Sequence, residues 1–129
     1  MSAYFDTSAI LKLVFEEDGT RALRSLVGEI RQRGEQPTTS WLGETEFRRS
    51  GLRHGIAQET TEGILADFAV FDLPKEIYEA AARIPLRELR TLDALHIAAA
   101  LRARSGFFVS YDQRQCEAAA ELGLSVLTP

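Results

Sequence analysis

The stretch Phe107-Phe108-Val109-Ser110-Tyr111-Asp112 decides the fold, because it is a short apolar run that ends on a carboxylate. Its aromatic and β-branched residues are typical of a buried strand. An alanine-rich helical segment at residues 92–104 precedes it, and a second helical segment at 113–122 follows it. A helix, a strand and a helix in this order indicate one strand of a helix-covered parallel sheet.

The same alternation extends outward over the rest of the chain. Hydrophobic spacing predicts further strands at 3–5, 36–40, 70–73 and 125–127, and helices at 9–14, 19–33, 41–54, 57–68 and 75–84. Gly34 is placed to end one helix, while Ser40 and Thr91 are placed to cap the N-termini of two others. Strands joined by helical crossovers pair in parallel. We therefore expect an α/β fold, a three-layer α/β/α sandwich with a mostly parallel sheet of about five strands.

Length and composition predict one domain over residues 1–129. The chain is 45% hydrophobic and 26% charged, as in ordinary globular proteins. Its N-terminus lacks the basic and apolar regions of a signal peptide, and no apolar run approaches the ~18 residues of a membrane span. Cys116 is the single cysteine, which excludes an internal disulfide and a cysteine-based zinc site. These features predict a cytoplasmic protein without a membrane partner.

The net charge of −4 disfavours nucleic acid as a partner, because most such binders carry a basic excess. It does not exclude one. A site built from several carboxylates makes the net charge more negative by itself. A bound divalent metal adds positive charge that the net charge of the residues omits.

Carboxylates stand where a ligand of an open α/β sheet would bind, beyond the carboxyl ends of the strands. Asp6 follows the first expected strand and Asp112 the fourth. Asp93 lies in the first turn of the helix after Thr91, and Glu46 lies on the helix that starts after the second strand. Such a group predicts a site for Mg²⁺ or Mn²⁺, which prefer carboxylate oxygens and water.

Each acid alone has a simpler explanation, since aspartates at strand ends and helix starts are often only caps. The context of Asp93 favours the metal site. Its helix is so apolar that it must be mostly buried, and burying a carboxylate without a cation costs free energy. Glu44 and Glu46 lie two residues apart on one helix and point about 200° away from each other, so only one of them faces the site.

Four motifs resemble those of PIN-domain nucleases, and more narrowly those of VapC-type toxins of type II toxin–antitoxin pairs. The resemblance covers nearly the whole chain and rests on the order and spacing of the motifs. They are Tyr4-Phe5-Asp6-Thr7-Ser8-Ala9-Ile10-Leu11-Lys12-Leu13, Thr39-Ser40 through Glu46-Phe47-Arg48-Arg49, Arg90-Thr91-Leu92-Asp93-Ala94-Leu95-His96-Ile97-Ala98, and Ser110-Tyr111-Asp112 with Ala118-Ala119-Ala120-Glu121-Leu122-Gly123-Leu124.

The resemblance implies a Mg²⁺- or Mn²⁺-dependent endoribonuclease that cleaves structured RNA such as tRNA or rRNA. The family's catalytic, metal-binding acids map onto Asp6, Glu46, Asp93 and Asp112. Glu46 is preferred to Glu44 because a hydrophobic residue and an arginine follow it. Hydroxyl neighbours of the acids map onto Thr7, Ser8 and Ser110. The implied partners are a VapB-type antitoxin and a second copy of the chain, in a homodimer or a toxin–antitoxin hetero-oligomer. Apolar faces at residues 23–30 and 64–68 are candidates for these contacts.

Other basic and reactive residues have weaker assignments. We expect His96 to be a core residue or a neighbour of the acids, His54 to end a helix, Cys116 to pack, and Trp41 to pack in a core or interface rather than stack on a base. Candidates for contacting RNA are Lys12, Arg48, Arg49, Arg53, Arg87, Arg90 and Arg114.

Alternative functions remain open from the sequence. The domain could act in RNA processing outside a toxin pair, or bind RNA or protein without cleaving. Aspartyl-phosphate enzymes fit poorly: Ser8 stands where the haloacid dehalogenase-like pattern needs a second aspartate, and the acid pair of a receiver domain is missing.

Overall fold

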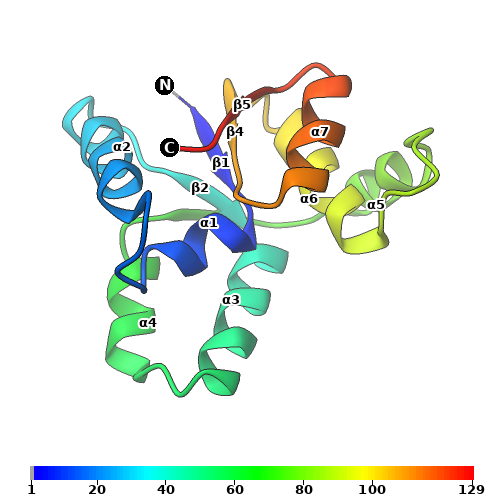
Figure 1. Cartoon of the computed structure of the whole chain (residues 1–129). Coiled ribbons are helices and arrows are strands. Elements are labelled where there is room, and N and C mark those ends of the chain that lie inside the picture. The colour runs from blue at the N-terminus through cyan, green and yellow to red at the C-terminus, as the bar shows by residue number, and fades with distance from the viewer. Residues whose placement is uncertain (1) are drawn as a thin grey trace.

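Five short parallel strands form the centre of the molecule in the computed structural model, which describes residues 2–129 (Figure 1). They are β1 (Ala3–Phe5), β2 (Thr38–Ser40), β3 (Ala69–Phe71), β4 (Phe107–Val109) and β5 (Ser125–Leu127). Their order in the sheet is β3-β2-β1-β4-β5, and every neighbouring pair is parallel. The α/β class and the parallel five-stranded sheet predicted from the sequence are confirmed.

Helices connect the strands and cover both faces of the sheet (Figure 1). Their bounds are α1 (Thr7–Lys12), α2 (Thr20–Gln32), α3 (Trp41–Arg53), α4 (Gln58–Leu65), α5 (Lys75–Ala82), α6 (Thr91–Arg102) and α7 (Gln113–Glu121).

The central strand β1 is buried on both sides because its residues alternate between two apolar cores. Tyr4 packs with residues of α5, α6 and α7, whereas Ala3 and Phe5 pack with residues of α1, α2, α3 and α4. None of the three is accessible to solvent. The three expected layers are therefore present, with β1 at the middle of the central one.

Two expected boundaries shift because side chains of the site compete for the backbone. Helix α1 begins at Thr7 rather than residue 9, because the Asp6 side chain accepts the amide hydrogen of Ala9 and caps it. Strand β4 ends at Val109 rather than residue 111, because the amide of Tyr111 donates to the Ser8 hydroxyl (2.9 Å) instead of to a neighbouring strand.

Two further expectations are wrong. Thr91 does not cap α6: Arg90 is the N-cap and makes no side-chain capping bond, because the helix already begins with the Ala94 amide bonded to the Arg90 carbonyl. The apolar faces at 23–30 and 64–68 are not free for a partner. Leu23 and Ile30 are inaccessible to solvent and pack in the core of this chain.

In the described part of the chain, no helix is both long enough and apolar enough to cross a membrane.

Candidate active site

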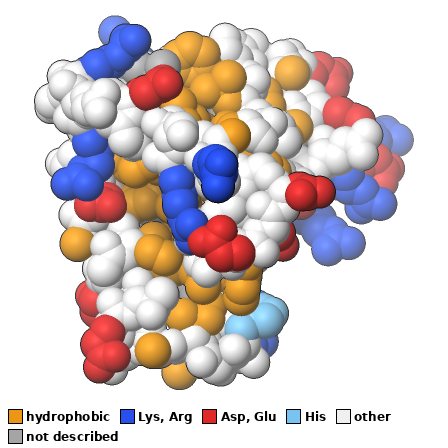
Figure 2. All heavy atoms as spheres, turned by 60° about the vertical axis from the view of Figure 1, so that its left-hand side comes forward, with side chains coloured by type: hydrophobic (Ala, Val, Ile, Leu, Met, Phe, Trp, Pro, Cys, Tyr) orange, Lys and Arg blue, Asp and Glu red, His pale blue; other side chains and the backbone are white. Residues whose placement is uncertain are grey.

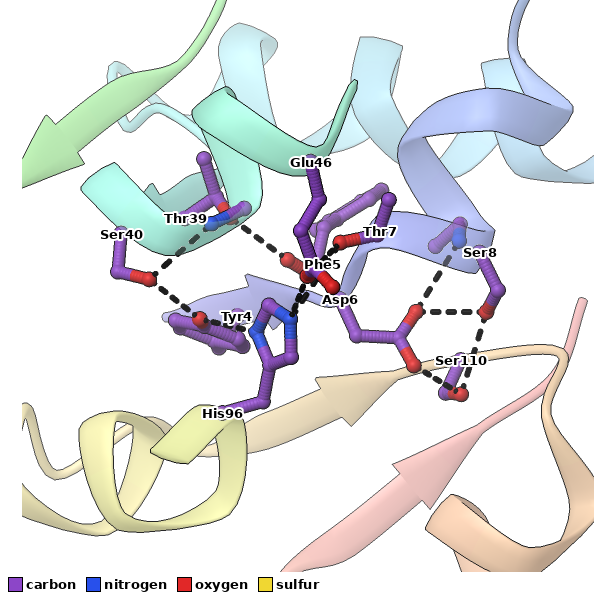
Figure 3. Close-up of polar contacts among 12 residues, drawn as sticks. Tyr4, Phe5, Asp6, Thr7, Ser8, Thr39, Ser40, Glu46, His96 and Ser110 are labelled. Carbon is purple, nitrogen blue, oxygen red and sulfur yellow. Dashed lines mark hydrogen bonds and ion pairs between the residues drawn. The ribbon is translucent and has the colours of Figure 1, made fainter. Parts of the chain in front are cut away.

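Asp6 lies at the carboxyl end of the central strand, and its side chain is held by three hydrogen bonds. Oδ1 accepts from the Ser8 hydroxyl (2.6 Å) and the Ala9 amide (3.1 Å), and Oδ2 accepts from the Ser110 hydroxyl (2.5 Å) (Figure 3). The residue is only 4% exposed. Burial raises the pKa of the Asp6 carboxyl, and the bonds from Ser110 and Ser8 offset part of that rise.

Ser110 ties Asp6 to a second acid, Asp112. Its hydroxyl donates to Asp6 and accepts the amide hydrogen of Asp112 (3.1 Å). The Asp112 side chain in turn caps α7 by accepting from the Gln115 amide (3.2 Å). Two predicted acids from β1 and from the segment after β4 therefore belong to one hydrogen-bonded unit.

Glu46 approaches the same region from α3. Its Oε1 accepts from the Thr7 hydroxyl (2.5 Å) and lies 2.6 Å from Nε2 of His96 (Figure 3). Partial burial alone would raise the pKa of the Glu46 carboxyl, but the bonds to His96 and Thr7 prevail and lower it. Glu44, two residues earlier, instead faces Arg48 at 3.6 Å.

Asp93 completes the group from the first turn of α6. Its pKa is raised, first by partial burial and then by the negative charge of Asp112, with smaller contributions from Asp6 and Glu46 that His96 partly offsets. Asp93 thus lies close enough to interact electrostatically with each of the other three predicted acids, although the four come from separate segments of the chain.

The donor chemistry of this group fits a hard divalent cation. Within residues 2–129, Asp6, Asp93 and Asp112 form no ion pair with lysine or arginine, so no basic side chain occupies the place of a cation beside them. In the same part of the chain no three acidic, histidine or cysteine side chains are yet close enough to hold one ion together. The acids are gathered, but Asp6, Glu46 and Asp112 are each turned toward hydrogen-bond donors of the chain, whereas Asp93 has no hydrogen-bond partner in residues 2–129.

The sequence of the chain matches the family description "PIN domain" over residues 3–121. The chain belongs to the PIN-domain family. Among curated proteins it is 33% identical over 130 residues to Ribonuclease VapC47 of Mycobacterium tuberculosis, an alignment that covers 98% of this chain and 96% of that protein. This likeness places the chain with the VapC ribonucleases, in which divalent-metal dependence is general.

Two solved structures share the fold of this PIN domain. One is Mycobacterium tuberculosis VapC20, described as a sarcin-ricin loop cleaving toxin, with a TM-score of 0.72, 16% identity and coverage of 99% of this chain and 100% of that one. The other is a toxin–antitoxin complex from Klebsiella pneumoniae, with a TM-score of 0.71, 20% identity and coverage of 99% and 98%. At these identities the structures support the fold.

A hollow of about 560 Å³ opens beside the acids of the PIN domain. Its lining includes Asp93 and Asp112 together with three of the predicted RNA-contacting residues, Arg87, Arg90 and Arg114. The hollow therefore combines the two chemistries that a nuclease needs: acids to hold a cation, and guanidinium groups to hold phosphate.

The other predicted RNA contacts of the PIN domain lie elsewhere and are mostly engaged. Lys12 pairs with Glu17 (3.0 Å) and stands over the Tyr111 ring. Arg48 pairs with Glu44 and Glu62. Arg53 donates to Ser50, and Arg49 is exposed on α3.

Four residues with weaker assignments are placed by the fold. His54 is the C-cap of α3 and its Nδ1 bonds the Ser50 carbonyl, as expected of a helix end. Cys116 packs against the Ser110 carbonyl. Trp41 is 57% exposed, so packing in a core is wrong for it. His96 is 3% exposed and bonds Glu46, so it is both a core residue and a neighbour of the acids.

The predicted cap of α3 by Ser40 is confirmed, since its hydroxyl accepts from the Gly43 amide, but sequence reasoning missed Tyr4. The hydroxyl of Tyr4 lies 2.7 Å from Nδ1 of His96 and 2.9 Å from Oγ of Ser40. In the sequence Tyr4 is one of three apolar strand residues, and nothing in that pattern marks its hydroxyl group as part of a site.

Proposed function

We propose that this chain is a single-domain, divalent-metal-dependent endoribonuclease that uses Mg²⁺ or Mn²⁺. Asp6, Glu46, Asp93 and Asp112 are the residues that would hold the metal. The observation that carries the proposal is the gathering of these four carboxylates beyond the sheet, three of them without a cationic partner in residues 2–129. An oxygen-rich, negatively charged group of this kind favours a hard cation over any protein side chain.

When bound, a divalent ion lowers the pKa of a coordinated water and neutralises charge that develops on the phosphate. The residues of this chain prepare that chemistry. Ser8 and Ser110 keep Asp6 in place, and Thr7 and His96 orient Glu46. Hydrolysis by a water leaves a 3′-hydroxyl and a 5′-phosphate.

Substrate RNA lies along the hollow beside the acids. Arg87, Arg90 and Arg114 contact its phosphates there, since guanidinium groups bind phosphate oxygens through paired hydrogen bonds. The other four basic candidates contact RNA only outside the hollow, because three of them already bond to other side chains. These four are Lys12, Arg48, Arg49 and Arg53.

The physiological role that fits best is the toxin of a toxin–antitoxin pair, acting in the cytoplasm on structured RNA such as tRNA or rRNA. Support comes from the VapC relative, from the structural neighbour described as a sarcin-ricin loop cleaving toxin, and from the neighbour solved as a toxin–antitoxin complex. A VapB-type antitoxin is the partner, in a homodimeric or hetero-oligomeric assembly.

The experiment compares Glu46→Gln with Glu44→Gln in cleavage of purified tRNA and rRNA. The two glutamates lie on one helix, but only Glu46 faces the acids, so E44Q is the matched control. We expect the wild type and E44Q to cleave in Mn²⁺ and to stop in EDTA, and E46Q to be at least about 100-fold slower, because the change removes a metal ligand. Cleavage by the wild type in chelator, or equal rates for the two variants, would contradict the proposal.

A further inference from the structure

A continuous chain of side-chain hydrogen bonds runs from the buried core to Glu46. The Ser40 hydroxyl accepts from the Gly43 amide (3.4 Å) and lies 2.9 Å from the Tyr4 hydroxyl. Tyr4 lies 2.7 Å from Nδ1 of His96, and Nε2 of His96 lies 2.6 Å from Oε1 of Glu46 (Figure 3). The participants come from β1, β2, α3 and α6, so the chain crosses the centre of the fold.

The direction of each bond in this chain follows from its ends. A glutamate side chain is a carboxylate at neutral pH and only accepts, so Nε2 of His96, 2.6 Å from Oε1 of Glu46, must carry a hydrogen. At the other end, the Gly43 amide can only donate to Ser40, and among the described residues the Tyr4 hydroxyl is the one acceptor within reach of the Ser40 hydrogen. Tyr4 then donates to Nδ1 of His96.

The opposite direction would leave a buried group unsatisfied. If Nδ1 of His96 donated to Tyr4, then Tyr4 would donate to Ser40, and Ser40 would have no acceptor for its hydrogen among the described residues. Ser40 is inaccessible to solvent, and a buried hydroxyl without an acceptor costs about 1–3 kcal/mol.

We propose that His96, held by Tyr4 with its hydrogen on Nε2, is a positioning residue that fixes Glu46 for metal binding. The proposal rests on the function proposed above. Oε1 of Glu46 receives hydrogen bonds from both His96 and Thr7, whereas Oε2 has no hydrogen-bond partner in residues 2–129. One oxygen anchors the side chain and the other is left for the cation. Carboxylate ligands held by such outer partners bind metals more tightly, and loss of the partner typically costs about 10–100-fold in affinity.

The packing around His96 agrees with a fixed orientation rather than with a loosely held ring. His96 meets the Tyr4 ring edge-on at a centroid distance of 5.8 Å. A Cβ added at Gly43 would lie 3.6 Å from Cε1 of His96 and 2.0 Å from Oγ1 of Thr39, so α3 sits directly against the ring. The imidazole is therefore a buried ring with a hydrogen-bond partner at each nitrogen.

The first test measures Mn²⁺ affinity of the purified, full-length protein by calorimetry for His96→Gln and His96→Asn. The glutamine amide nitrogen lies as many bonds from the backbone as Nε2 does, so H96Q keeps a donor for Glu46, whereas asparagine is one bond shorter and loses it. We expect H96Q to bind Mn²⁺ within about threefold of the wild type and H96N to bind at least about tenfold more weakly. Equal affinity for both variants, whether unchanged or weakened, would overturn the proposal, because the Nε2 donor would then be irrelevant.

Glu46→Gln separates this proposal from the proposed function. If E46Q binds Mn²⁺ as tightly as the wild type, then Glu46 is not a ligand and the proposed metal site itself is wrong. If E46Q weakens binding but H96N does not, only the positioning role fails.

A second measurement can be made with His96 and Glu46 unchanged and holds even if H96N does not fold. The chain has two histidines, so His54→Gln assigns the imidazole signals in an ¹⁵N NMR spectrum. We expect His96 to show a protonated Nε2 and an unprotonated Nδ1, and Tyr4→Phe to remove this fixed pattern. A protonated Nδ1 in the wild type would contradict the assigned direction of the chain.

Discussion

Asp6 and Asp112 each serve the fold and the site with the same side chain. Both cap a helix, and both are joined through Ser110. A capping aspartate is already held by backbone amides, so its position is set before any ligand arrives. The cost is electrostatic: burial raises the pKa of Asp6, and burial together with neighbouring acids raises the pKa of Asp93.

This repulsion predicts that Asp93→Asn stabilises the metal-free protein at neutral pH. A raised pKa means that the folded state binds the Asp93 proton more tightly than the unfolded chain, so stability falls as pH rises from the ordinary carboxyl range through the raised pKa. Asparagine avoids that loss. Because Asp93 is partly exposed and screened, we expect a gain of roughly 2–4 °C in Tm at pH 7 in EDTA.

The pH series supplies the control for this prediction. The advantage of D93N should vanish below about pH 3.8, where the wild-type Asp93 is protonated in both states. A variant that is less stable than the wild type at pH 7 without metal would show that the acids are not in conflict.

At the scale of elements, α3 determines the geometry of the site because it brings Glu46 and Ser40 against β1 and α6. Gly43 allows this approach, since a Cβ there would lie 2.0 Å from Oγ1 of Thr39. Thr39 is buried and bonds the Phe5 carbonyl, so it has little room to move. The first turn of α3 therefore packs directly against the Thr39 side chain of β2.

We expect Gly43→Ala to destabilise the protein by about 1–3 kcal/mol, because the added methyl overpacks this region. Gly63→Ala on α4 is the matched control: nothing lies within 4 Å of a Cβ at Gly63, so alanine should stabilise the exposed helix by up to about 1 kcal/mol. Urea unfolding followed by circular dichroism measures both. Equal behaviour of the two variants would mean that α3 does not lie as close to β2 as described.

Sequence pattern predicted the element types well because each helix and strand has its own hydrophobic period. The four acids were also found, since strand ends of a parallel sheet converge. What it could not show was how side chains compete for backbone groups. Ser8 takes the amide of Tyr111 and shortens β4, and Tyr4, apolar in its context, carries the hydroxyl that holds His96. Such contacts join residues about a hundred positions apart and leave no local period.

At the scale of the whole molecule, a net charge of −4 and an RNA substrate are compatible if a bound divalent metal offsets the charge of the acids in the site. On the face shown in Figure 2, basic and acidic side chains are interspersed, without a continuous basic surface. Elsewhere on the molecule, ion pairs such as Arg31–Asp67 and Arg48–Glu62 neutralise basic side chains. The arginines that remain beside the acids, Arg87, Arg90 and Arg114, line the hollow instead.

We therefore expect alanine at Arg87, Arg90 or Arg114 to weaken RNA binding and to lower the slope of log affinity against log salt by roughly 0.7–0.9 for each phosphate that is no longer neutralised. Arg21→Ala, on the exposed side of α2, is the control and should leave the slope unchanged. Fluorescence anisotropy across a salt series, with catalysis blocked by EDTA, gives both numbers. If none of the three substitutions in the hollow changed the salt slope, the RNA would bind at another surface.

The central claim is that four gathered carboxylates cleave RNA by metal-assisted attack of water, and end-group analysis of the fragments tests it most directly. With Mn²⁺ present, every fragment produced by the wild type should carry a 5′-phosphate or a 3′-hydroxyl at the new end, and Asp6→Asn should yield no such fragments. Fragments ending in a 2′,3′-cyclic phosphate, or the same fragments from Asp6→Asn, would contradict the account, because the RNA's own hydroxyl or a different site would then perform the cleavage.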